Sequence, residues 1–153
     1  MRNYRIKIEL LSDMCVSDGG IYNSAIDTDI CYDEYGFPYI PAKRLKGCLR
    51  ECALELKDWG MPIGVQEMFG TQGNDDSDSE KAGKAGAVHI RDAYIADKEC
   101  FVSEIRQNQS VSPVLCHPQN ILKVFSYVRT QTSIDYETGV AQEQSLRIMR
   151  VAN

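Results

Sequence analysis

Two prolines followed by an amphipathic stretch constrain the fold of this chain more than any other feature. Pro38 and Pro41 bracket the segment FPYIP, which we expect to be extended because the residue before a proline is disfavoured in helical conformation. A helix is predicted to start near Ala42, because the apolar residues that follow share one side of a helical wheel. That side, expected to face the core, contains Leu45, Cys48, Leu49, Cys52 and Leu56, and a separate basic side contains Lys43, Lys46, Arg50 and Lys57.

The rest of the chain predicts an α+β fold. Residues 3–11 alternate between apolar and polar side chains, which is typical of a half-buried strand. Residues 86–97 and 121–135 are predicted as further strands, and short helices are expected over 65–70 and 98–109. This order of elements favours a ferredoxin-like (RRM-like) antiparallel sheet with helices on one face.

Size and composition favour one domain. The 153 residues, of which 43% are hydrophobic, are enough to form a single core. The last segment, 140–153, has the pattern of a strand rather than of a tail. We therefore expect residues 1–153 to be a single domain in the N-terminal part of a longer protein, with the fold incomplete at its C-terminus. No run approaches the roughly 20 apolar residues of a membrane span, which favours a cytoplasmic protein without a membrane partner.

The distribution of charge matters more than its total. A net charge of −5 argues against nucleic acid when taken alone, because affinity for phosphate comes mostly from Lys and Arg. However, several acids lie in residues 71–86, a polar, Gly-rich stretch that we expect to be a mobile loop. These acids are Asp75, Asp76, Asp78 and Glu80. Without these four acids the rest of the chain is nearly neutral, so a local basic patch can still bind the phosphates of a nucleic acid.

The start of the predicted helix is a candidate phosphate site. The first backbone N–H groups of a helix have no partner within the helix, and they attract anions. Lys43, Arg44 and Lys46 add positive charge there, and Gly47 lacks the Cβ that would keep a backbone or sugar at a distance. The alternative is that these residues form a solvated helix face with no ligand.

The region around this helix resembles the signature of the RAMP (repeat-associated mysterious protein) superfamily, specifically the backbone subunits of type III CRISPR effector complexes. In that signature an acid-containing loop precedes a G-x-P-Y-I-P element and an L-K-G-x-x-R helix start. The matching residues are Asp27, then Gly36, Pro38, Tyr39, Ile40 and Pro41, then Leu45, Lys46, Gly47 and Arg50. A second stretch, from Arg129 to Ala141, is similar to the family's downstream segment that contains Ile-Asp and Thr-Gly pairs.

The resemblance implies a subunit that binds CRISPR guide RNA, together with other effector subunits and copies of itself. Lys46 and Arg50, with Lys43 and Arg44 beside them, are then expected to hold guide phosphates. The region from Arg129 onward is expected to belong to a hairpin that faces RNA.

The resemblance also implies a metal-dependent endoribonuclease that cleaves target RNA, because a loop aspartate of the family's cleaving subunit corresponds to Asp27. Mg²⁺ takes oxygen ligands and keeps most of its waters, so one carboxylate and substrate phosphates can suffice. Asp29 and Asp33 are close enough in sequence to share the ion. The chain departs from the family at Ala42-Lys43-Arg44, where small residues are usual, and it lacks a Gly-rich loop near residue 153.

The sequence is compatible with two other functions. A purely structural subunit would bind guide RNA without cleaving anything. A guide-processing endoribonuclease would cleave without metal by acid/base chemistry, for which histidine is the usual residue, and His89 and His117 are the candidates. A requirement for Mg²⁺ and for Asp27 distinguishes target cleavage from both.

Overall fold

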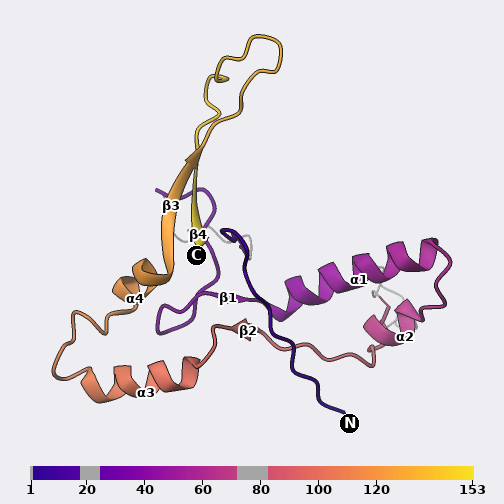
Figure 1. Ribbon diagram of the computed structural model, residues 1–153, viewed down its shortest axis with the longest axis horizontal. Helices are drawn as coiled ribbons and strands as arrows, with labels where there is room; N and C mark the ends of the chain where they lie inside the picture. Colours follow the sequence, from indigo (N-terminus) through magenta and orange to yellow (C-terminus); the bar gives the residue numbers. More distant parts are fainter. Residues whose placement is uncertain (1, 18–24, 72–82) are drawn as a thin grey trace. The chain divides into compact units, whose positions relative to one another are not determined.

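The computed structural model describes residues 2–17, 25–71 and 83–153 (Figure 1). The chain divides into two compact units. The central unit contains Ile40–Ala93, and the terminal unit combines the residues up to Tyr39 with those from Tyr94 onward. The boundaries fall within two short strands, β1 (Tyr39–Ile40) and β2 (Ala93–Tyr94), which form a two-stranded sheet.

The central unit is built on the helix that the prolines predict. Helix α1 (Ala42–Asp58) starts directly after Pro41 and is followed by α2 (Val65–Phe69), as the sequence indicates. The face of α1 that reaches the core differs from the prediction. Ala53 is the buried residue of α1, and it clusters with Val65, Phe69 and Ile63.

The predicted apolar side of α1 is largely exposed, because α2 has only five residues and covers one patch of α1. Cys48, Leu49 and Cys52 are exposed, and Leu45 and Leu56 are only partly buried. A helical wheel predicts which side of a helix is apolar, but it does not show which part of the helix a neighbour covers.

The predicted loop at 71–86 lies mostly outside the described residues. Its base is described: the backbone N–H of Thr71 donates to the Lys84 carbonyl at 3.0 Å, and the Lys84 N–H donates to Thr71 Oγ1 at 2.7 Å. Gly70 and Gly86 lie so close that a Cβ on Gly70 would be 2.8 Å from the Gly86 nitrogen. The hydrogen bonds between Thr71 and Lys84 link the two described ends of the loop.

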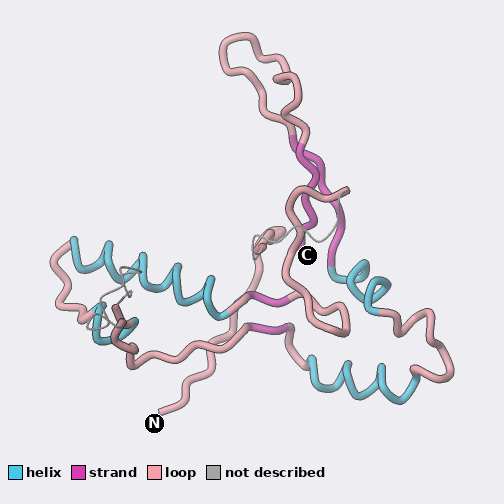
Figure 2. Tube along the Cα trace, turned by 180° about the vertical axis from the view of Figure 1, so that it is seen from behind, coloured by secondary structure: helices cyan, strands magenta, loops and turns pink. Residues whose placement is uncertain are grey.

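The terminal unit is organised by a β-hairpin. Strand β3 (Ser126–Gln131) pairs antiparallel with β4 (Arg147–Ala152), with Ser126 opposite Ala152 and Gln131 opposite Arg147. Figures 1 and 2 show a long loop that continues from the far end of these strands. The other edge of β4 contacts Met14 and Thr28 through isolated bridges to Ala152 and Met149.

Two helices complete this unit. Helix α3 (Lys98–Asn108) forms where it was predicted. Helix α4 (Pro118–Phe125) runs directly into β3 (Figure 1), although the sequence predicted a strand from residue 121. Proline is favoured at the first position of a helix, and the His117 side chain caps α4 by accepting from the Gln119 N–H. Leu122 of α4 packs with Ile30 and Ala152 in the core.

The α+β class is confirmed, whereas the ferredoxin-like arrangement stays a prediction, because the described strands form two separate two-stranded sheets. The strand predicted at 86–97 is reduced to β2. The strand predicted at 3–11 is wrong: its described residues form no strand, and Tyr4 and Ile6 are 81% and 76% exposed. Alternation supplies an apolar face, but a strand also needs a partner for its backbone. Within the described ranges, no helix is long and apolar enough to cross a membrane.

Candidate nucleic-acid interface

Basic side chains at the start of α1 form a candidate phosphate-binding site within the central unit. Lys43 is exposed, and Lys46 and Arg50 are half-buried. Within the described part of the chain, none of these three cations lies within 4.0 Å of an Asp or Glu carboxylate. The first turn of α1 also contains no acidic residue. Their charge is therefore available to an external anion.

The backbone of this helix start is less available than the sequence suggests. The N–H of Ala42 donates to Asp92 Oδ1 at 2.7 Å, so a carboxylate already occupies one of the expected anion positions. The N–H groups of Arg44 and Leu45 donate to the Pro41 carbonyl. A ligand at this end of α1 would consequently be held by side chains more than by backbone. Gly47 is exposed, and a Cβ there would meet no atom within 4 Å.

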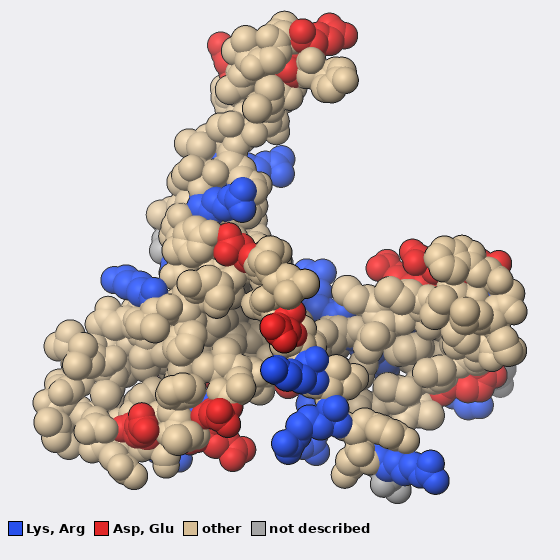
Figure 3. Space-filling model, in the orientation of Figure 1, with Lys and Arg blue, Asp and Glu red and all other residues tan. Residues whose placement is uncertain are grey.

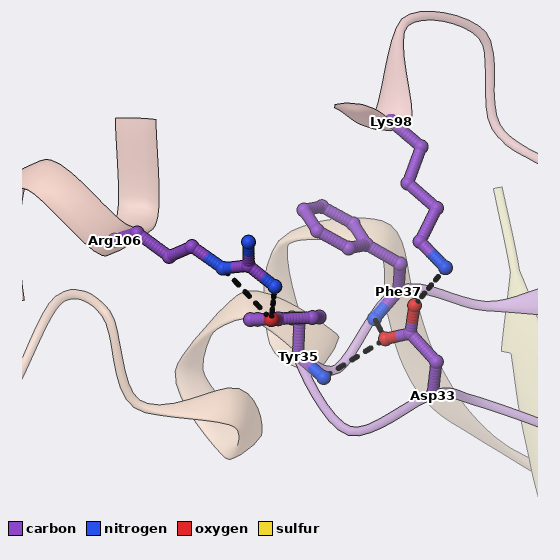
Figure 4. Close-up of polar contacts among 5 residues, drawn as sticks. All are labelled: Asp33, Tyr35, Phe37, Lys98 and Arg106. Atoms are coloured by element: carbon purple, nitrogen blue, oxygen red, sulfur yellow. Dashed lines mark hydrogen bonds and ion pairs between the residues drawn. The ribbon is translucent and has the colours of Figure 1, made fainter. Parts of the chain in front are cut away.

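The turn that precedes the proline element is fixed by Asp33 (Figure 4). Its Oδ1 accepts the N–H groups of Tyr35 and Phe37, both at 3.0 Å, and its Oδ2 lies 2.6 Å from Lys98 Nζ on α3. Because Oδ2 is buried and accepts no other hydrogen bond in the described structure, the lysine is its counter-ion. Arg106 of α3 donates from Nε and Nη2 to the Tyr35 hydroxyl, at 3.1 and 2.6 Å.

Position 36 of this turn requires glycine because of its backbone angle φ and because of the atoms that lie around it. Its φ is +91°, a conformation that side chains disfavour. A Cβ there would lie 2.0 Å from the carbonyl oxygen of Pro118, at the start of α4. The next residue, Phe37, is 1% exposed and packs against Phe101 and Phe125. The Gly-x-Pro part of the motif therefore serves the packing of the terminal unit.

The three loop aspartates have different environments. Asp29 is 5% exposed and pairs with Arg150 of β4, with 2.9 Å between Oδ1 and Nε. Asp33 pairs with Lys98, as described above. Asp27 alone is exposed, and its Oδ2 accepts the N–H of Ile148 at 2.7 Å. Asp29 and Asp33, which the sequence left open as further ligands of the ion, are both engaged by cations of the protein.

A group of three or more potential metal ligands is absent from the described residues. Of the three loop aspartates, Asp27 alone is not paired with a cation in the described structure, so the set of donors that this loop offers a metal is one exposed carboxylate. This set fits Mg²⁺, which binds through one or two carboxylates plus substrate phosphates, and it does not fit a metal that needs a complete protein cage.

The β3–β4 hairpin contains the second sequence motif. Arg129 lies on β3 with its side chain 52% exposed, 4.0 Å from Asp13 Oδ2. Asp13 also accepts a hydrogen bond from the Tyr127 hydroxyl, which raises the pKa of that tyrosine. Figure 3 shows acidic side chains over the tip of the hairpin and basic side chains over its strands. The predicted hairpin is therefore present, with a basic stem.

Asp135 organises the tip of this hairpin. Its Oδ1 accepts the backbone N–H of Thr138 at 2.8 Å, the Thr138 hydroxyl at 2.9 Å and the N–H of Glu137 at 3.1 Å. The hydrogen bonds from Thr138 hold the pKa of Asp135 below its ordinary value. Gly139 follows with a φ of +69°. The Ile-Asp and Thr-Gly pairs of the motif are thus the two sides of one turn.

The structure brings two of the predicted site residues to the same small sheet. Asp27 is bonded to Ile148, which is opposite Thr130, the neighbour of Arg129. The predicted residues on α1 belong to the central unit, whereas Asp27 and Arg129 belong to the terminal unit. Sequence reasoning missed Arg150, since no local pattern distinguishes this partly buried arginine from the exposed Arg147 of the same strand.

Taken together, the fold and the site define an α+β protein with basic side chains at the start of one helix and along the stem of a hairpin. A family model of the RAMP superfamily matches residues 7–152, so the chain belongs to the RAMP superfamily, as its motifs indicate.

A comparison with solved structures also finds a similar fold. The chain is similar to a chain in the cryo-EM structure of the Type III-B Cmr-beta bound to cognate target RNA, with a TM-score of 0.50 and 10% sequence identity. The similarity covers 92% of this chain and 76% of the other. No curated protein matches the sequence significantly.

Proposed function

We propose that this protein is an RNA-binding subunit of a type III CRISPR effector complex and that it holds the guide RNA through the first turns of α1. Three basic side chains there, Lys43, Lys46 and Arg50, lie within 4.0 Å of no carboxylate in the described structure, and this observation carries the proposal. Membership of the RAMP superfamily and the fold shared with a chain of a target-RNA complex support it. Target RNA, other effector subunits and further copies of the chain are the expected partners.

The proposed contacts are mainly electrostatic. Each Lys or Arg that neutralises a phosphate releases counterions, so binding weakens as the salt concentration rises. Arg44 is proposed to add positive charge at the start of α1, and Arg129 to contact RNA separately from the hairpin. The open space around Gly47 leaves room for a sugar or phosphate. The carboxylate of Asp92 at the N-terminus of α1 implies that the side chains, rather than the helix backbone, supply most of the affinity.

The test is the RNA affinity of the full chain with Lys46 and Arg50 both replaced by alanine. Affinity for a labelled single-stranded RNA should fall, and the plot of log affinity against log salt should become less steep by about 1.4, since each lost phosphate contact removes roughly 0.7 from the slope. Lys57→Ala is the control on the same helix, because it removes one positive charge from the last turn of α1 instead of the first turns.

The control should retain both the affinity and the salt dependence of the original protein. If the double variant folds and keeps both the RNA affinity and the salt dependence of the original protein, the start of α1 does not bind phosphate and the assignment must be abandoned.

We further propose that Asp27 supports metal-dependent cleavage of target RNA. Asp27 would hold Mg²⁺ through its exposed carboxylate, and the ion would stabilise charge on the reacting phosphate. Asp27 is favoured over its neighbours because Asp29 and Asp33 are occupied by Arg150 and Lys98. A histidine-based processing nuclease has less support, since His117 caps α4.

Asp27→Asn is the sharpest variant for this second proposal, because the amide oxygen can still accept the Ile148 N–H while the negative charge is lost. In the assembled complex with Mg²⁺, cleavage of target RNA should be abolished and guide binding should survive, as gel analysis and filter binding would measure. Cleavage that persists in Asp27→Asn would move the metal site elsewhere, and a complex that never cleaves would support the purely structural alternative.

A further inference from the structure

We propose that the buried ion pair between Asp29 and Arg150 positions the Asp27 carboxylate. Arg150 is then a positioning residue for the cleavage reaction, and it does not bind RNA itself. This inference rests on the proposed function for its catalytic consequence. The geometry that it describes can be measured without any activity.

The ion pair is enclosed by the protein. The side chains of Asp29 and Arg150 are only 5% and 12% exposed, and Arg150 Nε lies 2.9 Å from Asp29 Oδ1. The same oxygen accepts the N–H of Ile30 at 2.9 Å. A buried charge without a partner is strongly unfavourable, so each member of this pair requires the other. Among the basic residues of the hairpin, Arg150 is therefore already committed within the fold.

The backbone around this pair aligns the aspartate loop with β4. The N–H of Arg150 donates to the Thr28 carbonyl at 2.9 Å, and the N–H of Asp27 donates to the Ile148 carbonyl at 2.8 Å. In return, the N–H of Ile148 donates to Asp27 Oδ2 at 2.7 Å. Residues 27–29 are thus fixed to residues 148–150 by backbone bonds on one side and by the ion pair on the other.

This arrangement gives the two oxygens of the Asp27 carboxylate different surroundings. Oδ2 is held by Ile148, whereas Oδ1 accepts no hydrogen bond from any described residue. A carboxylate with one oxygen fixed and the other free presents a single, oriented ligand. Loss of the ion pair at Asp29 removes one of the contacts that keep this orientation, and a misplacement of about 1 Å can reduce a reaction rate roughly 100-fold.

The experiment compares Asp29→Asn, Arg150→Gln and Arg150→Lys with the original full chain. Arg147→Gln is the matched control, because it removes one arginine from an exposed position of the same strand. The first readout is amide hydrogen exchange at Ile148, whose N–H reports directly on the Asp27 carboxylate. Ala152, whose N–H donates to Met14, is the reference amide for the integrity of β4.

We expect exchange at Ile148 to become at least tenfold faster in Asp29→Asn and Arg150→Gln, while Ala152 stays protected. Arg150→Lys keeps the charge but loses the Nε donor, so it should give an intermediate rate. In the assembled complex, the first two variants should cleave target RNA about 10- to 100-fold more slowly and need more Mg²⁺ for half-maximal rate, with guide affinity unchanged. A loss of folded protein alone would lower the amount of active complex without changing its Mg²⁺ dependence.

Unchanged exchange at Ile148 in folded Asp29→Asn or Arg150→Gln would overturn the positioning role. So would an unchanged rate and Mg²⁺ dependence in variants whose complex forms normally. If Asp29→Asn and Arg150→Gln both fail to fold, Arg150→Lys is the variant that tests the proposal. An exchange rate at Ile148 equal to that in the original protein would then contradict it. If the original complex shows no metal-dependent cleavage, the catalytic proposal fails, whereas the exchange measurement still decides whether the ion pair positions Asp27.

Discussion

Helices α1 and α3 both carry basic residues, but the two helices use them differently. On α3, Lys98 pairs with the half-buried Asp33 and lies 3.5 Å from the ring centroid of Tyr94, and Arg106 donates to the Tyr35 hydroxyl. On α1, Lys46 and Arg50 have no carboxylate partner in the described structure. The charges of α3 therefore stabilise the terminal unit, whereas those of α1 remain available for a ligand.

Because of this difference, we expect substitutions near α3 and substitutions at the start of α1 to have separate effects on stability and on RNA binding. Variants of the residues that α3 engages should lower stability and leave RNA affinity unchanged in the folded protein. Variants at the start of α1 should do the opposite. The lesson for charged residues in general is that their partners, more than their number, indicate whether they hold a fold or a ligand.

The largest effect on stability is expected for Gly36→Ala. The new Cβ would lie 2.0 Å from the Pro118 carbonyl oxygen in a residue with a φ of +91°, so strain and overpacking together should cost about 3 kcal/mol or more. Gly47→Ala is the matched control in α1, because a Cβ there meets nothing within 4 Å and alanine is favoured over glycine in a helix by about 0.5–1 kcal/mol.

Urea unfolding and RNA binding of both variants together test the comparison. Gly36→Ala should be the less stable variant and Gly47→Ala the more stable one, and only Gly47→Ala should weaken RNA binding. If Gly36→Ala unfolds like the original protein, the turn is not packed against α4 as described. If Gly47→Ala binds RNA normally, no sugar or phosphate approaches that glycine.

A smaller effect is expected for Lys98→Met. This change leaves the Asp33 carboxylate, whose side chain is 10% exposed, without its counter-ion, and the loss should cost about 1–3 kcal/mol. Thermal unfolding would measure it, with Lys98→Met/Asp33→Asn as the control that removes both charges and should recover part of the stability. A weaker RNA affinity in folded Lys98→Met would break the distinction between α1 and α3.

Local patterns in the sequence predicted the parts of the fold that local physics determines. Pro41 and the apolar period that follows it are enough to place the start of α1, and α3 and β4 formed where they were expected. The strand predicted at 3–11 failed because its alternation has no strand to pair with in the described structure. The start of α4 was missed because Pro118 and the cap from His117 outweigh the strand-like residues that follow.

For the candidate site, too, the sequence predicts only what depends on neighbouring residues in the chain. The sequence identifies Asp27, Asp29 and Asp33 as equivalent loop acids, and the superfamily motif singles out the first. Their difference comes from Arg150 and Lys98, which lie far along the chain. The motif therefore selects Asp27 without a physical reason, and the structure adds one, because Asp27 is the loop aspartate that no cation engages in the described structure.

The tip of the hairpin has one further consequence. The hydrogen bonds that Asp135 accepts all come from Glu137 and Thr138, and Ser145 closes the base of the loop by donating to the Gln142 carbonyl and accepting from Ser133. The loop therefore takes its shape without help from a neighbour. A molecule that binds this tip therefore meets a turn that already has its own hydrogen bonds, which lowers the entropic cost of association.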